Sequence, residues 1–352
     1  MKEKIKIAVA FNEVHPELYF KKEQKNSAEL SFTPFFEVDQ TTPIEEFEYI
    51  ARKINSPKFL AFTFNLKDNL DSLIKMINQE KPDVIFNFIE LFNDNPRLEM
   101  NIVGLFELLD IPYTGASPMA LSTCQSKILV KQLLKSYGIL TPPFVVFNST
   151  AKNFNHSLKY PLIVKPAYED ASVGIENASI VTNKIKLKQR VEYVLDYFKQ
   201  PALVEEFIEG RELNISVMGD KNPFVLPISE IDFASMPGNL HNIVSYQAKW
   251  DPFHEAYHKT IPICPAKLNK RIEQFASQTA LKAFNVMGVR DYARVDIRLS
   301  KDNQLFVLEV NPNPDLTEGA GFMRSAHAAG LSYSRALKRI VMLAYERGKR
   351  AK

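Results

Sequence analysis

Residues 291 to 311 read Asp-Tyr-Ala-Arg-Val-Asp-Ile-Arg-Leu-Ser-Lys-Asp-Asn-Gln-Leu-Phe-Val-Leu-Glu-Val-Asn, in which apolar and polar residues largely alternate on both sides of the pair Asp302-Asn303. Alternation of this kind is typical of a half-buried strand. Asp and Asn tolerate the positive φ that a two-residue turn needs, so the pair is expected to connect the two strands. The stretch therefore predicts a β-hairpin that is turned at residues 302 and 303.

The register set by this turn brings four polar side chains together. Asp296 lies opposite Glu309 and Arg294 lies opposite Asn311, and alternation puts all four on one face. Opposed residues have Cβ atoms roughly 5 Å apart, where like charges repel. Two carboxylates and an amide at this spacing predict a bound cation, and hard oxygen ligands with room for water and phosphate suit Mg²⁺. The opposite, apolar face is expected to carry Val295, Ile297, Leu308 and Val310.

Length and composition restrict the classes of protein that this chain can belong to. At 352 residues it is too long for one small core, and two or three domains are expected. The net charge of +3 gives no electrostatic footprint for nucleic acid or a membrane surface. No apolar run approaches the ~18 residues that a membrane span needs. Two cysteines without metal spacing, and no signal peptide, predict a cytoplasmic protein.

The first third of the chain alternates short apolar runs with helical periodicity. We expect strands at residues 5–11, 59–64 and 83–89, and helices at residues 70–79 and 99–109, followed by a strand-like run at 111–114. This order predicts an open α/β domain with a parallel sheet over residues 1–117. Ligands usually bind beyond the carboxyl ends of such strands, which directs attention to residues 11–13 and 90–92.

Residues 118–352 change to strands joined by short turns with a few helices, a pattern that predicts an α+β region. The expected strands are residues 144–147, 162–165, 178–181, 202–207 and 213–218, besides the hairpin. The expected helices are residues 126–137, 186–198, about 270–285, and a last one from about Tyr333. In the helix at 126–137 we expect Ile128, Leu129, Leu133 and Leu134 to point inward. The region divides into a smaller part, 118–204, and a larger part, 205–352, which carries the hairpin.

Two further segments have a composition that suits nucleotide binding. Lys165 ends a strand and precedes the small residues of a loop, which can aim backbone N–H groups at phosphate while the lysine supplies a point charge. Surface hairpins rich in Gly and Ser are common, and by itself this segment favours that simpler interpretation. The run from residue 204 to 213 holds four glutamates, and Glu205 and Glu206 must point to opposite faces of a strand. Glu212 is suited to accept hydrogen bonds from ribose hydroxyls. Lys249 is an isolated lysine beside Trp250, and it is either a surface lysine or another contact to phosphate.

The order of these signals along the chain resembles the ATP-grasp superfamily, and within it the D-alanine–D-alanine ligase group. The signals are a strand-ending lysine with a small-residue loop, the Glu-Gly-Arg-Glu run at 209–212, an isolated lysine, Arg-Val-Asp at 294–296 and Leu-Glu-Val-Asn-Pro at 308–312. The resemblance extends from about residue 86 to 347 and includes the runs at 111–117, 125–127 and 138–142. It implies an ATP-grasp fold that is preceded by an open parallel-sheet domain.

The resemblance also implies a role for each residue that matches a family motif. Arg294 and Lys249 would be catalytic, because Arg294 would stabilise charge on the transferring phosphoryl group and on the later tetrahedral intermediate. Contacts to ATP are implied for Lys127, Lys165, Ser172, Glu205, Glu206, Phe207, Ile208, Glu212 and Lys249, with the backbone of 205–208 beside adenine and Glu212 at the ribose. Two Mg²⁺ ions, with Mn²⁺ as an alternative, are implied for Asp296, Glu309 and Asn311.

This chain departs from the family pattern where the amino-acid substrates bind. The loops at 10–15, 88–99 and 313–320 differ, Ala171-Ser172 replaces a pair of serines, and Trp250 replaces a tyrosine. The nucleotide and metal positions match, so the resemblance implies an active ligase whose substrates are not two D-alanines. The candidate substrate contacts are Glu13, Trp250, Asp315 and Ala320. Asp315 adds an acid near the second substrate, which favours a substrate with a positive group.

The activity implied is ATP-dependent ligation of a small carboxylate to an amine through an acyl phosphate, with release of ADP and phosphate. The alternative is a catalytically silent ATP-binding sensor or scaffold, which is expected to have lost Arg294 or a metal carboxylate. A two-metal phosphohydrolase is expected to carry more His and Asp ligands. Small-molecule carboxylate and amine substrates are the partners expected, with no nucleic acid and no membrane, and a homodimer stays open as the alternative to a monomer.

Overall fold

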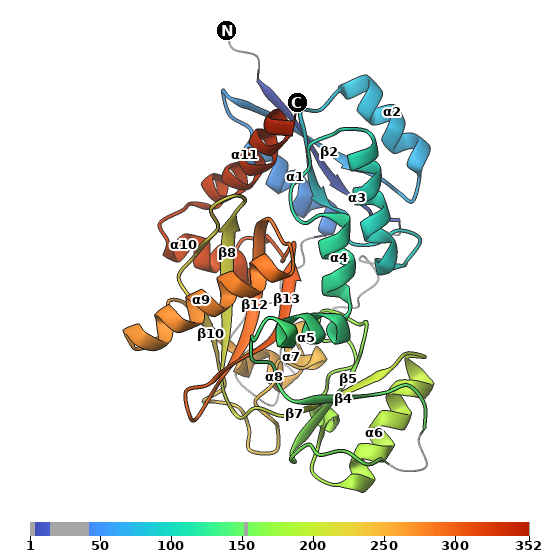
Figure 1. Ribbon diagram of the computed structural model, residues 1–352. Coiled ribbons are helices and arrows are strands. Elements are labelled where there is room, and N and C mark those ends of the chain that lie inside the picture. Colours follow the sequence, from blue (N-terminus) through green and yellow to red (C-terminus); the bar gives the residue numbers. More distant parts are fainter. Residues whose placement is uncertain (1–3, 15–41, 151–153, 352) are drawn as a thin grey trace.

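The computed structural model describes residues 4–14, 42–150 and 154–351, and in these residues the strands form three β-sheets (Figure 1). The first sheet is parallel, with the order β2-β1-β3, where β1 is Ile5–Phe11, β2 is Phe59–Asn65 and β3 is Val84–Phe88. The predicted parallel sheet is therefore confirmed. The run at 111–114 forms only an isolated bridge between Ile85 and Tyr113.

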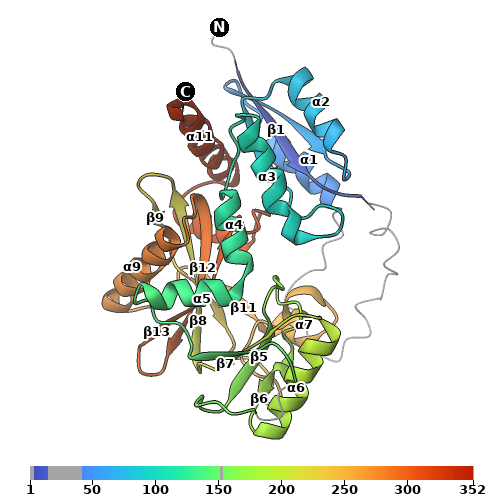
Figure 2. The same ribbon diagram turned by 45° about the vertical axis from the view of Figure 1, so that its right-hand side comes forward.

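Alternation along β1 determines which helices cover each face of this sheet. Ile5, Ile7 and Val9 belong to a core cluster with α1 (Pro43–Ile54) and the C-terminal helix α11 (Tyr333–Ala351). Ala8 and Ala10 pack with α2 (Leu70–Glu80) and α3 (Glu99–Leu108) instead. The last helix of the chain thus returns to the first sheet, as Figures 1 and 2 show.

The second sheet is antiparallel, with the order β4-β7-β5-β6. Its strands are β4 (Phe144–Phe147), β7 (Ala202–Glu206), β5 (Leu162–Pro166) and β6 (Ile180–Val181), and α6 (Lys184–Tyr197) packs on it through Leu187, Val191 and Val194. The first half of the strand predicted at 178–181 belongs to a 3-10 turn, η4 (Asn177–Ser179), so only its last two residues pair. β7 ends at Glu206, two residues beyond the predicted division at 204.

The third sheet, with the order β11-β10-β8-β12-β13, carries the hairpin. Its strands are β11 (Ile261–Ile263), β10 (Ser229–Asp232), β8 (Gly210–Gly219), β12 (Asp291–Ser300) and β13 (Leu305–Pro312), and β9 (Phe224–Val225) pairs with β8. The apolar face of β8 and β12 packs on α9 (Lys270–Val286) through Ala276, Ala280, Ala283 and Phe284. The remaining helices are α4 (Pro118–Gln125), α5 (Lys127–Ser136), α7 (Tyr246–Trp250), α8 (Glu255–Lys259) and α10 (Gly321–Ala328), with the 3-10 turn η3 (Pro96–Leu98).

The hairpin has the predicted register at its polar end but not near its turn. Asp296 pairs with Glu309 and Arg294 pairs with Asn311, as the sequence predicts. Leu299 pairs with Leu305, however, so the connection is longer than the predicted pair 302–303, and Asn303 adopts a φ of 60°. A register shift between Asp296 and Ile297 compensates for the longer turn, because one extra residue enters β13.

This shift corrects one part of the prediction. Ile297 pairs with Val307, which is buried, and not with Leu308, which is only partly buried. The bulge adds a residue to β13 and the longer turn moves the pairing by one residue in the opposite direction, so the two effects cancel beyond the bulge. The facing carboxylates therefore arise from a turn different from the one that was predicted.

A short segment at residues 113–116 attaches the first sheet to the hairpin. The Gly115 N–H donates to the Asp291 carboxylate at 2.8 Å, and the Ala116 N–H donates to the Asn313 Oδ1 at 2.9 Å. Gly115 has a φ of +91°, and a Cβ there would lie 2.1 Å from the Asn313 Oδ1. Only glycine fits this close approach with positive φ. Within the described residues, no helix is both long and apolar enough to cross a membrane.

Candidate active site

The polar face of the third sheet consists of three rows, each made of one residue from β8, one from β12 and one from β13. Because side chains alternate along each strand, residues two apart continue the same face. The first row is Ser216, Arg294 and Asn311, the second is Asn214, Asp296 and Glu309, and the third is Glu212, Arg298 and Phe306. Sequence analysis identified the β12 and β13 members of the first two rows, and the neighbouring strand β8 adds Asn214 and Ser216.

Asp296 is the centre of the hydrogen-bond network on this face. Arg294 donates through its Nε to Oδ1 at 2.7 Å and through its Nη2 to Oδ2 at 2.8 Å. Asn214 donates to Oδ1 at 2.7 Å and Asn311 donates to Oδ2 at 2.9 Å. Asn311 also donates to the Glu309 carboxylate at 3.1 Å, so one amide bridges the two carboxylates.

The two facing carboxylates differ in their surroundings. Burial, together with the nearby Glu309, raises the pKa of Asp296 against the opposing effect of Arg294. Burial also acts to raise the pKa of Glu309, but Lys127, the Asn311 amide, Arg294 and Lys165 outweigh it and lower that pKa. Cations therefore surround both carboxylates and act to lower each pKa against the effect of burial.

The donor set on this face fits a hard divalent cation. Two carboxylates and one amide leave most coordination positions for water and phosphate oxygens, as Mg²⁺ prefers. Among the described residues, no group of three or more His, Cys, Asp or Glu side chains is arranged to hold a metal. An ion bound here would consequently depend on other oxygens for most of its ligands, and Asn311 would turn its amide oxygen toward the ion.

Two lysines lie on either side of the buried carboxylate of Glu205. Lys165 donates to its Oε2 at 2.8 Å, and the Lys131 ammonium lies 2.5 Å from its Oε1. Lys131 also donates to the Thr141 hydroxyl at 2.8 Å. Burial acts to raise the pKa of Glu205, but the two lysines outweigh it and lower that pKa, while burial lowers the pKa of Lys131. Glu205 therefore orients Lys165, the lysine predicted to contact phosphate.

Lys131 corrects the predicted inward face of the helix at 126–137. In α5 the buried residues are Val130, Lys131 and Leu134, whereas Leu129 is 39% exposed. Apolar periodicity assigned the inward face to leucines because a lysine is normally expected in solvent. The spacing of Lys131 four residues after Lys127 was the signal available in the sequence, since residues four apart share a helix face.

The loop after β5 is attached to the segment that carries Lys249 and Trp250. The Ser172 hydroxyl donates to the Val244 carbonyl at 2.9 Å, and the Trp250 indole N–H donates to the Ala171 carbonyl at 2.8 Å. Ala171 and Ser172 both have positive φ, at 51° and 65°. The Lys249 ammonium lies 5.1 Å from the centre of the Trp250 ring. The structure therefore brings Ser172, Lys249 and Trp250 together, with Lys127 joined to the same loop through the Glu169 carbonyl.

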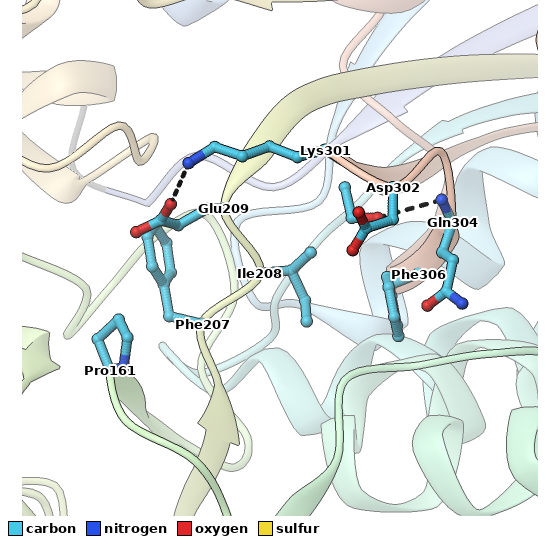
Figure 3. Close-up of a pocket in the computed structure, with 9 residues that line it drawn as sticks. Pro161, Phe207, Ile208, Glu209, Lys301, Asp302, Gln304 and Phe306 are labelled. Atoms are coloured by element: carbon cyan, nitrogen blue, oxygen red, sulfur yellow. Dashed lines mark hydrogen bonds and ion pairs between the residues drawn. The ribbon is translucent and has the colours of Figure 1, made fainter.

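The segment Glu206 to Ile208 leads from β7 to a pocket at the turn end of the hairpin. The Glu206 N–H donates to Pro143 at 2.9 Å and the Phe207 N–H donates to Pro161 at 3.0 Å. Figure 3 shows Phe207 and Ile208 on one side of this pocket of about 340 Å³, with the hairpin turn on the other. The volume lies in the range of small-molecule sites.

Glu212 and Arg298, at the same end of the sheet, form an ion pair. The Arg298 Nη2 lies 2.8 Å from the Glu212 Oε2, and both side chains are buried. Sequence analysis identified Glu212 but not Arg298. The signal available in the sequence was alternation, because Arg298 lies two residues after Asp296 and four after Arg294 and therefore belongs to the same face of the strand.

The predicted substrate loops meet at the edge of the first sheet. The Asn12 amide donates to the Leu91 carbonyl at 3.0 Å, and Glu13 exchanges hydrogen bonds with Asn65 at 2.9 Å each way. Glu90 is exposed, yet the surrounding protein desolvates its carboxylate and, with Asp315, raises its pKa to about 7. The structure therefore brings Asp315 near Glu90.

Glu99 is a carboxylate of this region that sequence analysis did not identify. Burial raises its pKa to about 8, and Glu90 adds to that shift. Gln125 donates to it at 3.4 Å, and the Gln125 and Asn313 amides oppose the rise of this pKa. Its position at the start of α3 gave no sign of this role, because acidic residues are common in the first turn of a helix.

Ala320, the remaining substrate candidate, lies at the start of α10. It is the N-cap residue, and no side chain caps this end of the helix. The Arg324 guanidinium, one turn into the helix, lies near Arg294, which together with burial lowers the pKa of Arg324. Uncapped N–H groups beside two guanidinium groups form a setting for an anion.

Comparison with known proteins agrees with this fold. Residues 133–342 match the family described as "D-ala D-ala ligase C-terminus". A D-alanine--D-alanine ligase of Carboxydothermus hydrogenoformans is 34% identical over 76% of this chain and 83% of its own length. An uncharacterized protein of Sinorhizobium fredii, y4sG, is 30% identical over 75% of each chain. A crystal structure of Bacillus anthracis D-alanine--D-alanine ligase complexed with ATP has a TM-score of 0.72 at 22% identity, and covers 99% of this chain and 100% of that one.

The fold is an ATP-grasp fold with a preceding parallel-sheet domain, as the sequence predicts, and its class of enzyme is the ATP-dependent amide-bond ligases. The chain belongs to the D-alanine–D-alanine ligase family.

Proposed function

We propose that this ligase joins a small carboxylate to an amine substrate that carries an additional positive charge, and that its substrates are not two D-alanines. The observation that carries the proposal is the cluster of acidic groups around Glu90. Asp315 and Asp170 both act to raise its pKa, and Lys249 is a cation that opposes them. A cationic substrate group would supply the missing counter-charge, because opposite charges at short range stabilise each other.

The opposite charge distribution at α10 supports an amino-acid-like substrate. Arg294, Arg324 and the uncapped start of the helix at Ala320 favour a carboxylate, whereas Glu90 and Asp315 favour an ammonium group. A molecule with a carboxylate at one end and an amine at the other would satisfy both. Glu13 and Trp250 are the further contacts that we assign to the substrates.

The polar face of the third sheet suits the phosphoryl-transfer half of the reaction. A substrate carboxylate oxygen attacks the γ-phosphorus of ATP and ADP departs, which gives an acyl phosphate. Arg294 stabilises charge on the transferring group, and Lys127, Lys165 and Lys249 contact phosphate oxygens. Ser172 lies in the loop that covers the phosphates. Mg²⁺ held by Asp296, Glu309 and Asn311 would neutralise charge on those oxygens.

The second half of the reaction forms the amide. The amine nitrogen attacks the acyl carbon, the C–O bond to phosphate breaks, and inorganic phosphate leaves with the bonding electrons. The amine loses a proton in this step, and the departing phosphate can accept it. Arg294 would stabilise the negative oxygen of the tetrahedral intermediate. The nucleoside is assigned to the backbone of Glu205 to Ile208, with Glu212 at the ribose.

A substrate screen tests the proposal. The purified protein is incubated with ATP, Mg²⁺ and pairs drawn from D- and L-amino acids, diamino acids and small carboxylates, and ADP, phosphate and product mass are measured. We expect one pair containing a diamino acid or another cationic amine to release ADP at least about tenfold faster than D-alanine alone, with a product lighter by one water than the summed substrates. The substrate proposal is wrong if D-alanine alone is the best substrate. Nucleotide binding without turnover of any pair would instead identify the silent sensor.

A further inference from the structure

Arg298 is the one buried cation of the third row, and the roles assigned above do not use it. Its side chain is 4% exposed. Burying a guanidinium group costs several kcal/mol unless it is paired and hydrogen-bonded, and an apolar residue would pack at this position without that cost. Its pairing with Glu212, the residue assigned to the ribose, connects it to the nucleotide.

The contacts of Arg298 hold Glu212 in one orientation. Its Nη2 lies 2.8 Å from the Glu212 Oε2 and also donates to the Asn242 carbonyl at 2.5 Å. Its Nη1 donates to the Gly210 carbonyl at 3.2 Å. The guanidinium therefore ties the start of β8 to the segment around residue 242, and the nitrogen that contacts Asn242 also holds the Glu212 carboxylate.

Aromatic rings on two further segments fix the plane of the guanidinium. Its central carbon lies 5.5 Å from the ring centres of both Phe207 and Phe233. Such contacts stabilise a cation and restrict its rotation. Phe207 also lines the pocket of about 370 Å³ to which Arg298 contributes. Arg298 is thus rigid, and it lies at the wall of a pocket large enough for a small ligand.

One oxygen of Glu212 remains for a ligand. Arg298 engages Oε2, and among the described residues no hydrogen bond engages Oε1. A carboxylate oxygen can accept hydrogen bonds from hydroxyl groups. A carboxylate that is already held at one oxygen loses little rotational freedom when its other oxygen binds a ligand. Arg298 therefore lowers the entropic cost of binding a hydroxyl group.

We propose that Arg298 is a nucleotide-specificity residue, which positions Glu212 so that its second oxygen recognises a ribose hydroxyl. This inference rests on the proposed function, since it takes ATP as the nucleotide and Glu212 as the ribose contact. It is a positioning role, because Arg298 acts on the ribose through Glu212.

The test compares Arg298→Met and Arg298→Lys with the wild type, using ATP, 2′-deoxy-ATP and 3′-deoxy-ATP. We expect Arg298→Met to raise KM for ATP about tenfold, the effect of a lost hydrogen bond to a charged group. KM for the deoxynucleotide that lacks the recognised hydroxyl should change less than about threefold, with kcat within about twofold for every nucleotide. Arg298→Lys should recover part of the preference for ATP, because it keeps the charge but not the planar fork.

The matched control is Arg211→Met. Arg211 forms an ion pair with Glu230 at 2.5 Å from the adjacent position of β8, whose side chain points to the opposite face. It should leave the preference between the nucleotides unchanged. The proposal is overturned if Arg298→Met weakens ATP and both deoxynucleotides equally, if it weakens none, or if it lowers kcat without changing KM.

Binding of non-hydrolysable ATP and its deoxy analogues, measured by calorimetry without other substrates, separates this proposal from the proposed function. If the wild type prefers the ribonucleotide and Arg298→Met does not, the role of Arg298 holds even if no substrate pair is ligated. If the wild type ligates substrates but binds ribo- and deoxynucleotides equally, the ligase stands and the role of Arg298 is wrong.

Discussion

Two groups of carboxylates in this protein have opposite surroundings. The hairpin pair, Asp296 and Glu309, lies among cations, and Arg294 donates two hydrogen bonds to it. The loop pair, Glu90 and Glu99, lies chiefly among other carboxylates, and the pKa values rise to about 7 and about 8. Within the protein, cations thus balance the negative charge of the hairpin pair, whereas the loop pair retains an excess of carboxyl groups over cations.

The difference indicates which charges each region leaves for its ligands. We infer that a small hard cation would bring polyanionic phosphate onto the face of the hairpin pair, because the surrounding lysines and Arg294 complement the negative charge of the carboxylates and of the phosphate. The loop pair can reach balance by taking up protons or by binding a cationic substrate. We infer that the first region suits a metal cation together with phosphate, and that the second suits a cationic substrate group.

The largest expected effect comes from substitutions at Asp296 of the hairpin pair and at Arg294, which donates to it. Arg294→Ala and Asp296→Asn should each reduce kcat by about a hundredfold to a thousandfold, as expected when a group that stabilises transition-state charge is removed. Circular dichroism should show that both variants remain folded. Arg52→Met, an exposed change on α1, is the activity control. Full activity in either site variant would make the assignment of this face wrong.

A second effect concerns the buried Lys131 beside Glu205. Lys131→Met should reduce the free energy of unfolding by about 3 kcal/mol, because one of the two cations that balance a fully buried carboxylate is removed. Lys188→Met removes an exposed pair with Glu192 and should cost no more than about 0.5 kcal/mol. Denaturant titration measures both, and equal small effects would show that the buried pair does not stabilise the fold.

The loop pair predicts a pH dependence of stability. The folded pKa of Glu99 lies above its ordinary value of 4.5, so its contribution to stability is fully present below about pH 4.5 and is lost as pH rises toward 8. Glu99→Gln should therefore raise stability relative to the wild type at pH 8 by about 1 kcal/mol and make the decline between pH 5 and 8 shallower. Urea unfolding at several pH values measures it, and identical slopes for both proteins would contradict it.

The smallest expected effect concerns Asp315. Because Asp315 acts to raise the pKa of Glu90, Asp315→Asn should lower the titration midpoint of Glu90 by about 0.3 pH units. Carboxyl-carbon NMR of the two variants measures it. Asp302→Asn, an exposed change in the hairpin turn, should leave that midpoint unchanged. If Asp315→Asn leaves the midpoint of Glu90 unchanged, Asp315 and Glu90 do not interact electrostatically, and this result would contradict the proposed cation site.

Local pattern predicted much of the fold and of the phosphate side. Several elements lie within a residue or two of their predicted bounds, since short-range periodicity specifies them. They are the strands β1, β2, β3 and β4 and the helices α2, α3 and α9. The elements that were not predicted are the helices α1, α4, α7, α8 and α10 and the strands β9, β10 and β11. On α2, Leu73, Met76 and Ile77 are buried while Leu70 and Ile74 are about 40% exposed, so apolar character alone does not decide which side chains tertiary packing buries.

By itself, the sequence determined that Asp296 and Glu309 face each other, because alternation and an antiparallel hairpin leave few other registers. Only the tertiary structure determined how that register is reached, since the longer turn and the bulge in β13 offset each other. Only it placed Lys131 against Glu205, Arg298 against Glu212, and Glu99 near Glu90. The physical reason is that local periodicity reports which face a residue prefers, whereas electrostatic partners are fixed by which distant strands and helices pack together.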